Sequence, residues 1–152
     1  MTLEQFKTLL EATVKDPSLQ PKLDGTTYCN IAVRRVALAF GCEEFYDGML
    51  ANDMCKHLAV SSNFGRIDGE TAAQQARVPS LVIAAHQYAE HGHVAVVYPA
   101  AEMYMSPSLK KEVPFLANVG KKNGILPESV DFPVAHGESI YYLYCKDENS
   151  LD

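Results

Sequence analysis

The sequence predicts a single α+β domain in which N-terminal helices are followed by an antiparallel sheet. In the first half of the chain, apolar residues recur at three- and four-residue steps, as on one face of a helix. After Val78-Pro79 they gather in short runs rich in β-branched and aromatic side chains. A chain of 152 residues fits one domain, 1–152. Within it we expect a core at about 25–145 and an acidic tail at 146–152.

The helices are predicted from periodicity and from their end signals. The first runs from Thr2 to about Lys15, and Thr2 with Gln5 three residues later has the pattern of a capping box. Gly41 is a natural C-terminal stop and Asp68 a candidate N-terminal cap for later helices. The three further predicted helices cover Cys29–Phe40, Met49–Leu58 and about Gly69–Arg77.

The strands are predicted after the helices. The β-branched run at 93–98, HVAVVY, has the length and composition of a strand. The predicted strands are Leu81–Ala85, 93–98, Phe115–Val119 and Ile140–Cys145. Helices followed by strands favour an antiparallel sheet.

Composition and charge exclude two classes of partner. The formal charge of −6 and the pI of about 5.3 argue against a nucleic-acid binder, which needs a basic surface. The apolar run Leu81–Ala85 is far shorter than the ~20 residues of a membrane-spanning helix. The N-terminus does not resemble a secretory signal. We therefore expect a protein that is cytoplasmic at synthesis, and that reaches the periplasm or cell wall, if its substrate lies there, by a route without a signal peptide.

One of the four cysteines is a candidate nucleophile. No CxxC pair exists, so the usual structural zinc spacing is missing, and we expect reduced thiols. Cys42, Cys55 and Cys145 are interpreted as small buried apolar residues. Cys29 instead starts a predicted helix after a loop, where the helix dipole favours the thiolate. The unpaired first N–H groups of that helix can serve as oxyanion donors.

A histidine at the start of a strand is the candidate base. His93 follows Gly92 at the first residue of the β-branched run, a position that is both fixed and accessible. The plainer interpretation is a surface histidine at a strand end, and His91 could compete for the role. His57 and His86 have weaker sequence contexts. His136 lies in a glycine-containing loop that we expect to be solvated.

Asn118 is the candidate third residue. It could accept a hydrogen bond from the imidazole and fix its tautomer, or it could simply help a turn before Gly120. Cysteine at a helix start, histidine at a strand start and then a polar residue is the chain order of papain-like enzymes. Such a dyad or triad needs no cofactor.

The sequence also resembles a known group. The segments GTTYCNIAVRRVALAFG and LVIAAHQYAEHGHVAVVYP are similar to those of amidases of the NlpC/CHAP superfamily, above all the peptidoglycan amidase effectors of type VI secretion systems. MLANDM and VPFLANVGKKN also fit, and the resemblance covers roughly Gly25 to Tyr144. Members often have Ser, Gly or Asp after the cysteine, where this chain has Asn30.

The resemblance implies a bacterial cysteine hydrolase with a papain-like fold, in which N-terminal helices carrying the cysteine pack on an antiparallel sheet carrying the histidine. It implies Cys29 as nucleophile, His93 as base and Asn118 as third polar residue. The implied substrate is an amide bond in the stem or cross-link peptides of peptidoglycan, and an inhibitor or immunity protein is a further partner to expect.

Three alternatives stay open. The same dyad could act as a hydrolase or transferase on a protein or another amide substrate, or the fold could be an inactive peptide-binding module. The third alternative is a zinc site built on His91, His93 and Cys29, although no fourth ligand is evident.

Overall fold

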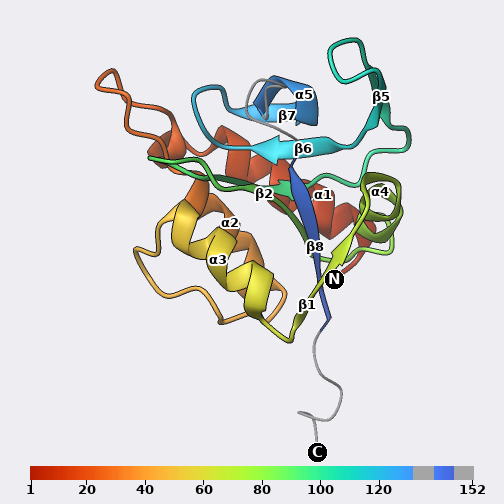
Figure 1. Cartoon of the computed structure of the whole chain (residues 1–152), viewed down its shortest axis with the longest axis horizontal. Helices are drawn as coiled ribbons and strands as arrows, with labels where there is room; N and C mark the ends of the chain where they lie inside the picture. The colour runs from red at the N-terminus through yellow and green to blue at the C-terminus, as the bar shows by residue number, and fades with distance from the viewer. Residues whose placement is uncertain (132–138, 146–152) are drawn as a thin grey trace, which may run out of the picture.

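The chain has an α+β fold in which N-terminal helices pack on a six-stranded antiparallel sheet, with a small separate hairpin (Figure 1). The computed structural model describes residues 1–131 and 139–145. His136 and the acidic segment 146–152 lie outside the described residues.

The predicted helices form within two residues of their expected ends. Thr2 caps the first helix through the predicted capping box, with Thr2 and Gln5 each accepting from the other's backbone N–H. Asp68 caps a later helix by accepting from Thr71 N–H at 2.8 Å. The helices are α1 (Leu3–Lys15), the 3-10 turn η1 (Pro17–Leu19), α2 (Cys29–Ala39), α3 (Ala51–Val60), α4 (Gly69–Ala76) and the short α5 (Glu128–Asp131).

The six-stranded sheet contains the four predicted strands and two that the sequence did not reveal. Its order is β1-β8-β2-β3-β6-β7, with every neighbouring pair antiparallel. The strands are β1 (Phe64–Ile67), β2 (Val82–His86), β3 (His93–Val97), β6 (Phe115–Asn118), β7 (Gly124–Pro127) and β8 (Ile140–Tyr144). The hairpin pairs β4 (Tyr104–Ser106) with β5 (Lys111–Val113). Because β1 lies between α3 and α4, the predicted order of helices before strands is incomplete.

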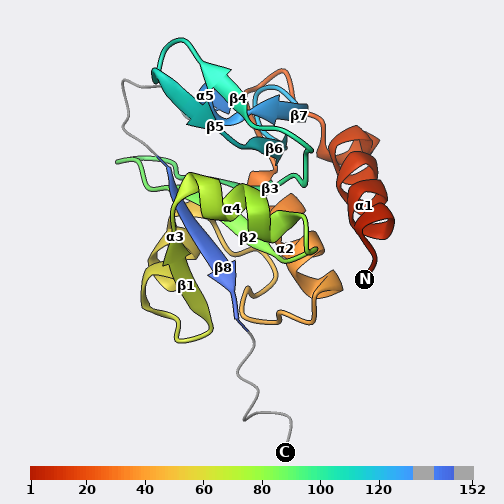
Figure 2. The same cartoon turned by 90° about the vertical axis from the view of Figure 1, so that its right-hand side faces the viewer.

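The central strands carry most of the core. Residues 82–85 of β2 and 94–97 of β3 are buried without a break. Successive side chains of a strand point to opposite faces, so both faces of the sheet are covered here. Helix α2 packs against β3, while α1 lies along β6 and β7 (Figure 2). The backbone of Val94, the second residue of β3, lies against the Cys29 thiol at the start of α2.

Cysteine burial follows the sequence interpretation at two of three positions. Cys42 and Cys55 are buried as expected, whereas Cys145 is exposed because it follows the end of β8. All four thiols are free. Within 1–131 and 139–145, no helix has the length and apolar character needed to span a membrane.

Candidate active site

Cys29 is the first residue of α2, as the sequence predicted. The chain reaches it through a turn in which Lys22 N–H donates to Thr26 C=O at 2.9 Å, and Gly25 takes a φ of 91° that favours glycine. The cap residue Tyr28 makes no side-chain hydrogen bond to the helix end. The first N–H groups of α2 are therefore not occupied by a capping side chain.

The protonation state of Cys29 differs from the sequence expectation. The side chain is only 6% exposed, and burial raises the pKa of the thiol. The backbone N–H groups of Val94, Asn30 and Cys29 itself lower this pKa, but by less than burial raises it. The prediction of a thiolate favoured by the helix start is therefore wrong for the resting protein. The donors are present, but desolvation outweighs them.

His93 begins β3 and is fixed by Asn118. The ring Nε2 lies 2.7 Å from the Asn118 Oδ1. Asn118, at the end of β6 and 1% exposed, donates its Nδ2–H to the Lys122 C=O at 2.7 Å. Since that bond points the amide nitrogen away from the ring, Oδ1 must accept, and Nε2 must carry the proton. The imidazole Nδ1 is then left as the proton acceptor.

The environment of His93 favours the neutral imidazole. Burial lowers its pKa below the usual 6.5, and the bond to Asn118 opposes this only in part. A neutral thiol and a neutral imidazole are thus the resting forms. Proton transfer between them belongs to the reaction rather than to the resting protein.

The three predicted residues gather at one end of the central strands. The Cys29 thiol lies beside the backbone of Val94, the residue that follows His93, and α2 packs on β3. His93 bonds to Asn118 directly. His91, by contrast, lies exposed in the connection before β3 rather than on the strand. Among the residues that the structure describes, no group of three or more His, Cys, Asp or Glu side chains is placed to hold a metal ion.

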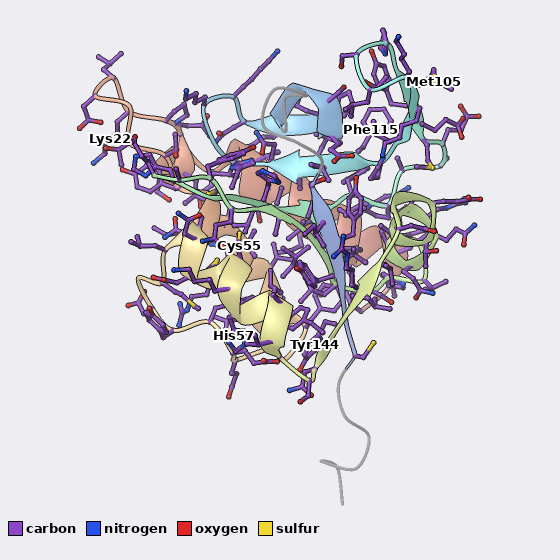
Figure 3. The ribbon with its side chains drawn as sticks, viewed as in Figure 1. Lys22, Cys55, His57, Met105, Phe115 and Tyr144 are labelled. Atoms are coloured by element: carbon purple, nitrogen blue, oxygen red, sulfur yellow. The ribbon has the colours of Figure 1, made fainter. Side chains whose placement is uncertain are left out.

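The two residues that flank Cys29 in the chain, Tyr28 and Asn30, have defined partners. Asn30 donates its Nδ2–H to the Met49 C=O at 2.9 Å and so fixes the segment before α3. The Lys22 ammonium lies 5.8 Å from the centre of the Tyr28 ring, at the projecting loop labelled in Figure 3. Asn30 therefore orders the wall beside the nucleophile.

Two glycines that the sequence analysis did not single out as functional shape the site. A Cβ on Gly120 would lie 3.1 Å from His93 Cε1, and a Cβ on Gly92 would lie 2.4 Å from Asn52 Oδ1. Both contacts are too short for a side chain to fit without displacement. The available signal was adjacency, since Gly92 precedes His93 and Gly120 follows Asn118 by two residues.

Comparison with known proteins adds no assignment. No protein family matches the sequence, and no curated protein is significantly similar to it. The chemistry must therefore be argued from the residues and their geometry.

Proposed function

We propose that this protein is a papain-like cysteine hydrolase of the NlpC/CHAP type that cleaves an amide bond in peptidoglycan stem or cross-link peptides. The observation that carries the proposal is the Asn118–His93 hydrogen bond of 2.7 Å at the strand end beside the Cys29 thiol. That bond leaves the imidazole Nδ1 free of a proton, as a general base requires.

The reaction begins with proton transfer. His93 Nδ1 takes the thiol proton as the Cys29 sulfur attacks the amide carbonyl, which forms a tetrahedral intermediate. The unpaired N–H groups at the start of α2 donate to the oxyanion. Since burial raises the thiol pKa and lowers the imidazole pKa, both groups start neutral, and the proton moves as the sulfur attacks.

The second half returns the proton. The His93 imidazolium protonates the leaving amine, and a thioester remains on Cys29. The neutral imidazole then takes a proton from water, which hydrolyses the thioester and restores the thiol. Through both steps the Asn118 amide holds the ring in one orientation.

The substrate class rests on the resemblance of the segments around Cys29 and His93 to peptidoglycan amidases. With that substrate, delivery to the periplasm or cell wall belongs to the proposal. So does an inhibitor or immunity protein that protects the producing cell.

Digestion of purified peptidoglycan sacculi, with fragments identified by mass spectrometry, tests the proposal. We expect new peptide fragments from the wild type and none from folded Cys29→Ala or His93→Ala. Cys55→Ala is the matched control, because Cys55 is an equally buried thiol close to Cys29 (labelled in Figure 3) without a helix-start position. It should keep activity.

Full activity in folded Cys29→Ala would refute the assignment of Cys29 as the nucleophile. A folded wild type that releases no fragments from sacculi would refute the peptidoglycan substrate, and would favour a protein substrate, acyl transfer or an inactive binding module.

A further inference from the structure

The turn between β6 and β7 carries a second asparagine whose side chain bonds at both ends. Asn123 Oδ1 accepts from Gly120 N–H at 2.9 Å, and Asn123 Nδ2 donates to the Leu19 C=O at 2.9 Å. Leu19 ends η1, 104 residues earlier in the chain. The turn is therefore fastened to the segment that leads into the loop before Cys29.

One end of this bridge touches the candidate site, and the other touches the segment that precedes the loop before Cys29. On one side, Gly120 is the residue whose α-carbon faces the His93 ring, and its turn also supplies the Lys122 carbonyl that orients Asn118. On the other side, the chain runs from Leu19 through the loop to Cys29. One half-buried side chain thus links the residues that hold the base to the residues that present the nucleophile.

Only an amide meets both ends of the bridge. An acceptor must face the Gly120 N–H and a donor must face the Leu19 C=O, and asparagine has one of each at the correct reach. Aspartate would keep the first bond but place an oxygen against the Leu19 carbonyl. Alanine would lose both bonds.

We propose that Asn123 is a positioning residue that holds the His93–Asn118 pair in register with Cys29. The role in catalysis rests on the proposed function, whereas the effect on the imidazole does not. Loss of the bridge frees the 119–123 turn, and with it the Lys122 carbonyl that fixes the Asn118 amide. The imidazole then loses its single tautomer.

The test compares Asn123→Ala and Asn123→Asp with the wild type. The substrate-independent measurement is the ¹⁵N NMR spectrum of the imidazoles, with His93 assigned by its loss in His93→Gln. The wild type should show the Nε2–H tautomer alone, and both variants should show a mixture with Nδ1–H. On sacculi, kcat should fall about tenfold with KM unchanged, as expected for a misplaced catalytic group.

The matched control is Asn63→Ala. Asn63 is another half-buried asparagine, and it lies beside β1 at the opposite edge of the sheet, where it contacts Glu44. It should leave the His93 tautomer and kcat unchanged whatever it does to the melting temperature.

The outcomes separate the two proposals. A single Nε2–H tautomer in folded Asn123→Ala, or wild-type behaviour in Asn123→Asp, would overturn the positioning role. If Asn123→Ala does not fold, Asn123→Asp alone decides. A tautomer mixture in the variants of a protein that cleaves no sacculi would uphold the positioning role and refute the proposed function.

Discussion

Gly120→Ala should weaken catalysis much more than it weakens the fold. The added Cβ would lie 3.1 Å from His93 Cε1 and 3.6 Å from Asn118 Nδ2. Carbon atoms normally pack at about 3.5 Å or more, so the ring must move by roughly 0.3–0.4 Å. If a displacement of about 1 Å costs about a hundredfold in rate, this smaller shift predicts a fall in kcat of about four- to sixfold.

The stability change is expected to be small. Overpacking lowers the free energy of unfolding by about 1–3 kcal/mol. Replacing glycine by alanine at a position with an ordinary backbone conformation raises it by about 0.5–1 kcal/mol, because the unfolded chain has less conformational entropy. The net loss should stay near 1–2 kcal/mol, which lowers the melting temperature of a chain of this size by about 2–8 °C.

The assay measures turnover on sacculi and thermal unfolding of the same preparations. Gly65→Ala is the matched control, because a Cβ on Gly65 in β1 would meet no atom within 4 Å. Unchanged turnover in Gly120→Ala would refute the steric reasoning. An equal loss of turnover in Gly65→Ala would show that the effect does not come from the contact with His93.

Three further predictions concern the stability of the fold. Gly92→Ala places a Cβ 2.4 Å from Asn52 Oδ1 and 3.0 Å from its backbone nitrogen, so thermal unfolding should show a loss of about 1–3 kcal/mol or more, and an unchanged melting temperature would contradict the contact. Because burial lowers the pKa of His93, the unfolded chain protonates it first. The contribution of neutral His93 to the free energy of unfolding is fully present above about pH 6.5 and is lost as the pH falls from there through the folded pKa. In urea titrations, His93→Gln should therefore lose less stability at acid pH than the wild type, and an identical pH profile of the two proteins would refute this linkage. Glu44→Ala leaves the Ser61 hydroxyl without its carboxylate acceptor, and should cost about 1–3 kcal/mol in urea unfolding, whereas wild-type stability would show that water replaces the bond.

Local signals in the sequence predicted the elements that they control. The capping box at Thr2 and the β-branched run from His93 each act within a few residues, so the helix and the strand appear where predicted. The edge strand β1 escaped prediction because Gly65 and Arg66 interrupt its apolar pattern. Its pairing with β8, about 75 residues later, supplies what the local sequence lacks.

The chemistry of the site was only partly accessible from sequence. Chain order indicated Cys29, His93 and Asn118, and the hydrogen bond between the last two is now defined. The raised pKa of the Cys29 thiol was not predicted, because desolvation depends on how α2 packs against β3. The Asn123 bridge was also invisible, since its partner Leu19 is distant in sequence.

The position of β8 in the sheet has a consequence for biosynthesis. This strand is inserted between β1 and β2, although it follows every other strand in the chain. A growing polypeptide that has not yet reached residue 140 leaves both of those partners with an open edge. Strand β1 can join the four strands on the other side of β8 only after nearly all of the described chain has been made.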